Sequence, residues 1–281
     1  MYIHYRDRSV SYNVPVIMGI VNVTPDSFSD GGKNYIIDDA LSSVEKMVGT
    51  GVDIVDIGGE SSRPGADRIS EDEEIRRVIP LIKGIKKEFD VRVSIDTTKE
   101  SVARLAVEEA GADIINDISA LKGSLRMAET VSELNVPVVL MHMKGKPKDM
   151  QNDPFYNDVV EELFSFFKER IDFSIGKGIK RDRIIIDPGI GFGKRVEDNV
   201  QILKNLKRFT ELGLPLLIGL SRKSFLGKIS GENNPAMRGA ETITADIISI
   251  INGASILRVH DVENCIRSIK ILKELVPEID S

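Results

Sequence analysis

The sequence predicts an α/β fold, a TIM (β/α)8 barrel with its site at the carboxyl ends of the strands. Eight short apolar runs recur along the 281 residues, and each is followed by a stretch with helical spacing. Such alternation is typical of a parallel sheet, and eight units in this length fit a barrel. An open doubly wound sheet is the alternative. Because no linker or change in composition divides the chain, residues 1–281 are expected to form one domain.

The first expected strand covers residues 16–21, a run without polar residues that ends at Asn22. The residues before it are interpreted as a tail. The other expected strands are residues 54–57, 91–95, 114–115, 138–141, 184–186, 216–219 and 256–257. The expected helices are residues 36–49, 71–89, 99–110, 125–134, 157–176 and 196–212, one that ends near residue 253, and 262–275.

Composition excludes several classes of protein. A formal net charge of -6 argues against a nucleic-acid surface, because phosphate binding needs a basic field. A single cysteine, Cys265, excludes an internal disulfide and is expected to be a buried structural thiol. No apolar run is long enough to span a membrane, and the N-terminus lacks the apolar core of a signal peptide. A soluble, cytoplasmic protein without membrane or nucleic-acid partners is therefore expected.

Polar side chains lie at or just past nearly every predicted strand end, where a barrel gathers its loops. They are Asn22, Asp56, Asp96, Asn116, His142, Asp187, Lys223, Arg258 and His260. Helix capping is an alternative role for each of them, and it is preferred for Asp117, Asp149 and Asp261. For Asp96, Asn116 and Asp187, which directly follow apolar residues, a functional role is favoured.

The basic residues indicate an anionic substrate. Arg258 and His260 are two residues apart, so both can face the same side of a strand. Together with Lys223 and Arg63 they concentrate positive charge in an acidic protein, which favours a phosphate or diphosphate group. Asn22 beside a diphosphate could hold Mg2+, which prefers oxygen ligands.

Carboxylate and amide groups indicate a second part of the ligand. Asp187 and Asn116 could bind the donor–acceptor edge of an amino-pyrimidinone ring, although spacing alone does not identify the heterocycle. The glycine-rich loop, residues 189–194, matches neither a Rossmann fingerprint nor a phosphate-binding P-loop. Its glycines suit close approach of the backbone to a flat ligand, with Phe192 as a wall and Met141 nearby.

These motifs together resemble the dihydropteroate synthase family, which joins p-aminobenzoate to a pterin. The most specific stretch is Met-Gly-Ile-Val-Asn-Val-Thr-Pro-Asp-Ser-Phe-Ser-Asp-Gly-Gly at residues 18–32. Further matching motifs follow in order over nearly the whole chain, at residues 56–65, 94–99, 114–117, 141–143, 187–194, 221–224 and 258–261.

The resemblance implies a role for each matching residue. The residues implied to hold the pterin are Asp96, Asn116, Asp187, Lys223, Arg258, Met141 and Phe192. Those implied for the diphosphate are Asn22, Arg63, Arg258 and His260, with Mg2+ as cofactor at Asn22. Those implied for p-aminobenzoate are Phe28, Asp30, Ser62, Arg63, Pro64 and Ser224. Those expected to act in catalysis are Asp96, Lys223, Arg63 and Asp30. Ser62 departs from the threonine that is common in the family, which leaves sulfonamide sensitivity open.

The implied reaction is loss of diphosphate from the pterin methylene carbon, followed by attack of the arylamine nitrogen on the resulting cation. A homodimer is common in the family and is expected here. One rival is a pterin-binding methyltransferase that acts on methyltetrahydrofolate and a corrinoid protein, which would need no diphosphate site. A non-catalytic binding module is the other, and the full set of charged residues at the strand ends argues against it.

Overall fold

The barrel predicted from the sequence is present in the computed structural model, which describes residues 1–12, 15–23, 33–61 and 65–277. Eight parallel strands pair in the order β8-β7-β6-β5-β4-β3-β10-β9, and a bridge between Ile186 and Leu216 joins the two ends of this order. The strands are β3 (Val16–Asn22), β4 (Ile54–Gly58), β5 (Arg92–Asp96), β6 (Ile114–Asp117), β7 (Val138–Met141), β8 (Ile184–Asp187), β9 (Leu217–Ile218) and β10 (Ile256–Val259).

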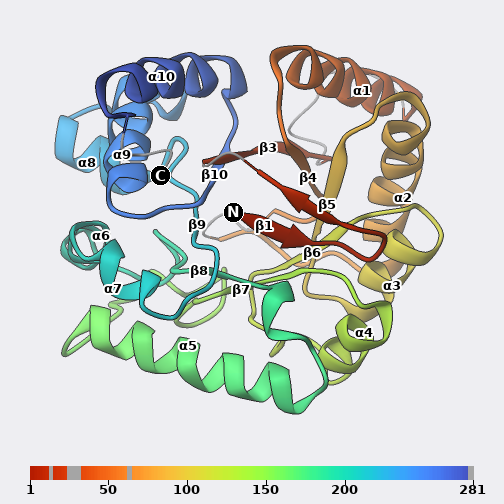
Figure 1. Ribbon diagram of the computed structural model, residues 1–281, viewed down its shortest axis with the longest axis horizontal. Helices are drawn as coiled ribbons and strands as arrows, with labels where there is room; N and C mark the ends of the chain where they lie inside the picture. The colour runs from red at the N-terminus through yellow and green to blue at the C-terminus, as the bar shows by residue number, and fades with distance from the viewer. Residues whose placement is uncertain (13–14, 24–32, 62–64, 278–281) are drawn as a thin grey trace.

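Helices surround the sheet on its outer side (Figure 1). They are α1 (Lys33–Thr50), α2 (Glu71–Glu88), α3 (Glu100–Glu108), α4 (Met127–Leu134), α5 (Val159–Gly176), α6 (Val196–Lys204), α7 (Leu206–Thr210), α8 (Ser224–Ser230), α9 (Gly239–Ile251) and α10 (Val262–Leu275), with short 3-10 helices η2 (Arg181–Arg183) and η3 (Pro235–Met237).

Two predicted helices are each divided in the structure. The one expected over residues 196–212 breaks at Asn205, whose backbone (φ -116°, ψ 25°) ends α6 and begins α7. The one expected to end near residue 253 is preceded by a separate helix, α8. Gly231 ends α8 in the left-handed conformation (φ 87°), and the side chain of Asn234 then caps η3.

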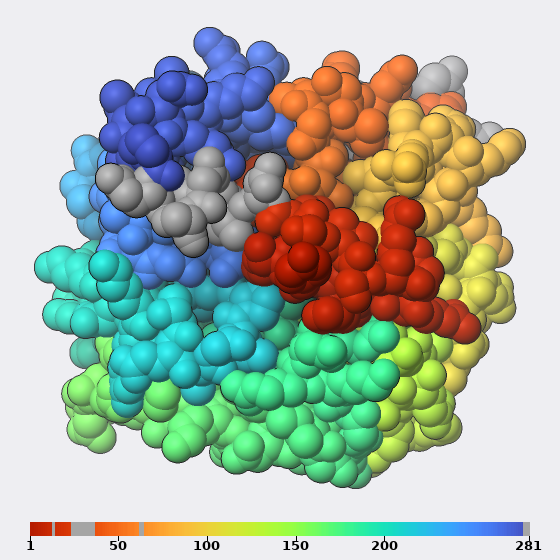
Figure 2. All heavy atoms as spheres, in the orientation of Figure 1, coloured from red at the N-terminus to blue at the C-terminus, as the bar shows by residue number. Residues whose placement is uncertain are grey.

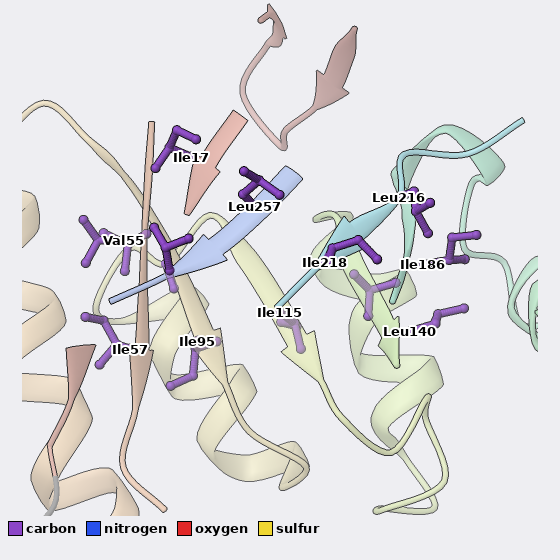
Figure 3. Packing of buried hydrophobic residues seen from close by; sticks show 14 of the residues in the cluster. Ile17, Val55, Ile57, Ile95, Ile115, Leu140, Ile186, Leu216, Ile218 and Leu257 are labelled. Carbon is purple, nitrogen blue, oxygen red and sulfur yellow. The ribbon is translucent and has the colours of Figure 1, made fainter. Parts of the chain in front are cut away.

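Alternate residues of each strand face opposite sides of the barrel wall, as strand geometry requires. Ile17, Val55, Ile95, Ile115 and other residues of the same parity point outward and pack against the helices in one large buried cluster (Figure 3). Cys265 of α10 belongs to this cluster, so the prediction of a buried thiol is confirmed.

Residues of the other parity form the interior of the barrel. Near the start of the strands this interior is apolar, and its members are Val16, Met18, Ile54, Ile114, Val139, Ile185, Leu217 and Ile256. Ile3 and Tyr5 from the N-terminal segment join the same cluster. The floor of the barrel is therefore filled with side chains and cannot hold a polar ligand.

The N-terminal segment is an antiparallel hairpin, β1 (Tyr2–His4) with β2 (Ser9–Ser11), so its interpretation as a tail is wrong. It lies across the amino end of the barrel, on the face seen in Figures 1 and 2. Tyr5 packs under Arg92 of β5, whose guanidinium carbon lies 4.3 Å from the ring centroid, and its hydroxyl lies 2.7 Å from that of Tyr12. These contacts with the barrel explain why short, mixed segments form strands here.

Three carboxylates that were assigned to local capping do cap backbone amides. Asp117 accepts from the amides of Ser119 and Leu121, both at 2.8 Å. Asp149 accepts from the amide of Lys146 at 2.9 Å, and Asp261 caps α10. Among the described helices, none is long and apolar enough to cross a membrane.

Candidate active site

The polar residues predicted at the strand ends lie directly above the apolar floor. Asp96, Asn116, Asp187 and Arg258 each come two residues after an inward-facing member of β5, β6, β8 or β10, so their side chains enter the barrel at its carboxyl end. Met141 occupies the same position on β7 and is buried. Short strands with strict alternation thus build a polar layer on an apolar one.

Arg258 lies at the centre of this layer. Its Nε donates to Asp56 Oδ2 at 2.6 Å, and its Nη2 donates to Asp96 Oδ2 at 2.8 Å. Asn116 Nδ2 donates to the same oxygen of Asp56 at 3.1 Å, which leaves the amide oxygen of Asn116 available to a ligand. The guanidinium is therefore held flat by two carboxylates from β4 and β5.

Burial shapes the electrostatics of this network. Burial raises the pKa of Asp96 to about 7, although Arg258 opposes the shift. Burial by itself lowers the pKa of Arg258, but Asp56 and Asp96 raise it above its usual value, so the guanidinium stays charged. A carboxyl that titrates near neutrality beside a fixed cation is typical of a functional site.

Asp56 is one of the residues that the sequence analysis placed at a strand end but gave no role. It is fully buried, and its Oδ1 has no hydrogen-bond partner in the described part of the chain. The signal that could have identified it is a lone carboxylate inside the apolar run Ile54–Ile57. Its geometry makes it the partner that orients Arg258 and Asn116.

Asp187 and Lys223 form the second half of the layer. Asp187 Oδ1 accepts the amide of Gly189 at 2.7 Å, and burial raises the pKa of Asp187 to about 6. Burial lowers the pKa of Lys223 to about 8, although Asp187 opposes this. The ammonium of Lys223 lies 4.2 Å from the ring centroid of Phe192. The glycine-rich loop thus places an aromatic ring beside Lys223.

Asn22 and His260 lie at neighbouring strand ends. A Cβ on Gly58 would lie 3.3 Å from Asn22 Oδ1 and 3.8 Å from Asp96 Oδ2, so the glycine leaves room for both side chains. His260 Nδ1 lies 2.9 Å from Ser221 Oγ, which joins the ends of β10 and β9. These two residues extend the polar layer along the β9–β10–β3–β4 side of the rim.

Some predicted site residues lie elsewhere or outside the described residues. Ser224 is the exposed first residue of α8 and lines an open pocket of about 480 Å3, which Gly191, Lys194 and Lys228 also line. None of the carboxylates of the polar layer lines this pocket, which lies beside that layer. The predicted residues outside the described ranges are Phe28, Asp30, Ser62, Arg63 and Pro64.

His142 and Lys194 form a buried pair that the sequence analysis did not connect. Lys194 Nζ lies 2.9 Å from His142 Nδ1. Burial and the charge of Lys194 lower the pKa of His142 to about 2, so the imidazole is neutral. No group of three or more histidine, cysteine or acidic residues that could hold a metal occurs within the described ranges.

The fold and this rim define an α/β-barrel enzyme with a polar layer at the carboxyl ends of its strands. A family model described as "Pterin binding enzyme" matches residues 18–260. The dihydropteroate synthase of Haemophilus influenzae is 44% identical over 262 residues, which cover 93% of this chain and 94% of that protein.

Solved structures of dihydropteroate synthases are also similar to this chain. A Xanthomonas albilineans dihydropteroate synthase with 4-aminobenzoic acid superposes with a TM-score of 0.92 at 43% identity, over 98% of this chain and 97% of that one. Another structure of the X. albilineans enzyme, in complex with 7,8-dihydropteroate, gives a TM-score of 0.88 at 40% identity and covers 98% of each chain. The chain belongs to the dihydropteroate synthase family of pterin-binding enzymes, which are transferases of folate biosynthesis. The resemblance and the TIM-barrel fold predicted from the sequence are both confirmed.

Proposed function

We propose that this chain condenses 6-hydroxymethyl-7,8-dihydropterin diphosphate with p-aminobenzoate to form 7,8-dihydropteroate and diphosphate. The observation that carries the proposal is the polar layer itself, in which Asp96, Asn116, Asp187 and Arg258 converge from four strands of a barrel of this family. In such barrels the site lies at the carboxyl end of the strands.

The pterin ring would bind across this layer. Asp187 uses one oxygen for the amide of Gly189 and keeps the other for ring N–H or amino donors. The amide oxygen of Asn116 would accept a further hydrogen bond. Arg258, held flat by its two carboxylates, would stack on the ring, while Lys223 with Phe192 and Met141 would enclose its other sides.

The reaction needs stabilisation of charge at two places. The bond between the methylene carbon and the diphosphate oxygen breaks, and its electron pair leaves with the diphosphate. Asn22, Arg63 and His260 would bind this leaving group, while Asp96 stabilises the positive charge that spreads into the ring. The arylamine nitrogen then forms the new bond to carbon and loses a proton.

The proposed cofactor is Mg2+ at Asn22. The amide oxygen of Asn22 is a ligand of the type that Mg2+ accepts, and the ion usually takes most of its ligands from substrate phosphates and water. This fits a rim without a three-residue acidic cluster among the described residues. When bound, the ion would neutralise charge on the diphosphate.

The arylamine would lie nearer the mouth of the barrel. Phe28, Asp30, Ser62, Arg63 and Pro64 are proposed to surround it on the basis of the family motifs, and Ser224 to meet its carboxylate. Of the residues proposed for catalysis, Asp96 and Lys223 lie in the polar layer. The assignment of Arg63 and Asp30 rests only on the family motifs in the sequence.

A homodimer in the cytoplasm is proposed as the working form. Ile248 and Ile251 are each 48% exposed on α9, and Ile271 and Leu275 are exposed on α10. Large exposed apolar side chains on neighbouring helices support an interface between copies. Light scattering during size-exclusion chromatography tests this, because a monomeric mass at micromolar concentration would contradict it.

Turnover by the purified chain tests the proposed function. Dihydropteroate should form from the two substrates, and removal of Mg2+ with a chelator should abolish the product until Mg2+ is restored. Binding of the pterin diphosphate without product would mean that the arylamine site is wrongly assigned. If the pterin diphosphate does not bind, the proposal is contradicted and the pterin-binding methyltransferase is favoured. An assay for transfer of a methyl group from methyltetrahydrofolate to a corrinoid protein would then test that alternative.

A further inference from the structure

Lys194 ends the glycine-rich loop and is only 2% exposed. Its ammonium contacts Gly189 O at 3.0 Å, Phe192 O at 3.1 Å and His142 O at 3.3 Å, besides His142 Nδ1. A buried ammonium is costly unless its donors are satisfied. Burial lowers the pKa of Lys194 to about 7, although the charges of Asp187 and Asp198 oppose the shift. Here its acceptors are backbone carbonyls of the loop and the end of β7, together with one imidazole nitrogen.

The loop lies flat against the residues that follow β7. Gly189 and Gly193 adopt left-handed conformations (φ 64° and 62°), and a Cβ on either would overlap a carbonyl oxygen, of His142 and of Lys144 respectively. Gln151 and Asn199 hold Gly191 from the other side through its carbonyl and its amide. These contacts restrict the backbone of the loop, whose carbonyls surround the amine of Lys194.

Lys194 is linked to the polar layer through hydrogen bonds to two residues, Gly189 and Phe192. Gly189 donates its amide to Asp187, and its carbonyl accepts from Lys194, so the lysine holds the peptide group that directly follows the one bound to the Asp187 carboxylate. Phe192 accepts from Lys194 at its carbonyl, while its ring lies under Lys223. One buried side chain thus contacts both the residue whose amide holds the Asp187 carboxylate and the residue that carries the aromatic wall.

We propose that Lys194 is a positioning residue for the pterin ring, which clamps the glycine-rich loop so that Asp187 and Phe192 are held in place for binding. The inference rests on the proposed function and adds a residue to which no role has been assigned. The inference concerns binding of the pterin and not of the arylamine, so replacing Lys194 should change KM for the two substrates by different factors.

The first test replaces Lys194 with methionine, which keeps the length of the chain and removes the charge. The dissociation constant and KM for the pterin diphosphate should rise about ten- to hundred-fold, the range expected when hydrogen bonds from a charged donor are lost. KM for p-aminobenzoate at saturating pterin should change less than threefold. Lys228→Met is the matched control, because Lys228 lines the same pocket from α8, and its pterin affinity should equal that of the unchanged chain.

A second variant separates positioning from loss of folding. Lys194 lines the open pocket of about 480 Å3, so Lys194→Ala creates space that a small amine in solution can enter. Millimolar n-propylammonium should restore pterin affinity to this variant, whereas n-propanol should not. Restoration by the amine alone would identify the ammonium as the clamp.

The outcomes are distinct. Unchanged pterin affinity in Lys194→Met would overturn the inference, as would a folded Lys194→Ala variant that the amine does not restore. An equal rise in both KM values would also overturn it, because it would indicate general damage. If the unchanged chain binds no pterin diphosphate, the proposed function fails instead.

Discussion

Replacing Asp246 by asparagine should stabilise the protein, and the gain should grow with pH. Asp246 lies on α9 and is 2% exposed, and neither carboxylate oxygen has a hydrogen-bond partner within the described part of the chain. The Cys265 thiol and the Ser268 hydroxyl of α10 line the same small, mainly apolar cavity. Burial raises the pKa of Asp246 from 3.8 to about 8.

The size of the effect follows from this difference in pKa. At pH 7 the unfolded chain carries an ionised Asp246 and must take up a proton to fold, which costs about 4 kcal/mol at about 1.4 kcal/mol per pKa unit. Asparagine avoids that cost but leaves an amide with unmet hydrogen bonds, worth about 1–3 kcal/mol. A net gain of about 1–3 kcal/mol at pH 7 to 8 remains, or about 2–6 °C in Tm at this size.

The sign of the pH dependence is fixed. Because the folded pKa is raised, the acid contributes its full stability below about pH 4 and loses it progressively as the pH rises to about 8. Thermal melts followed by circular dichroism from pH 4 to 8 should therefore show curves for the two proteins that diverge as the pH increases. Asp172→Asn, on the exposed face of α5, is the control and should show no such divergence. A Tm difference for Asp246→Asn that is equal at pH 5 and pH 8 would refute the reasoning.

Three further substitutions test the layers of the barrel. Asp187→Ala should weaken binding of the pterin diphosphate by a factor of ten or more in calorimetry, because buried ring donors lose their acceptor; unchanged affinity would mean that the pocket is wrongly assigned. Tyr5→Ala should cost about 3–4 kcal/mol in urea unfolding, since the ring packs on the barrel floor under Arg92; a loss below 1 kcal/mol would show that the hairpin is not a packed part of the core. Gly189→Ala should reduce pterin affinity and stability together, because its Cβ overlaps the carbonyl of His142 and its φ is 64°; a neutral result in both assays would contradict the described loop.

Much of the fold was predictable because its signals are local. An apolar run such as Ile114–Ile115 predicts a strand from local sequence alone, and period-two alternation then indicates which later side chain points into the barrel. This is why Asn116 and Asp187 could be placed at one rim from the sequence alone. The helix boundary at Gly231 also had a local signal, a glycine shortly before a proline, although the sequence analysis did not use it.

Features that depend on distant partners could not be predicted in the same way. The N-terminal hairpin forms because Tyr5 meets the barrel floor and Arg92, which lies 87 positions further along the chain. Lys194 was given no role because three of its four partners are backbone carbonyls, which leave no pattern in side-chain identities, and the fourth, His142, lies 52 positions away in the chain. Asp56 acts through Arg258, 202 positions away, so its role appears only when β4 and β10 are seen on either side of β3.

The closure of the barrel has a consequence for hydrogen exchange. Strand β9 has two residues, and the bridge between Ile186 and Leu216 joins it to the β8 side; in this bridge the amide of Ile186 donates to Pro215 O at 3.0 Å. Peptide groups beside so short a pairing open at lower free energy than those between β3 and β4. This seam lies between the strands that carry Asp187 and lead to Lys223. Local opening of this seam would change the width of the space in which a flat ring binds. A bound ring would hold the seam closed, so amide hydrogen exchange at residues 216–218 should slow more than exchange in the other strands of the barrel.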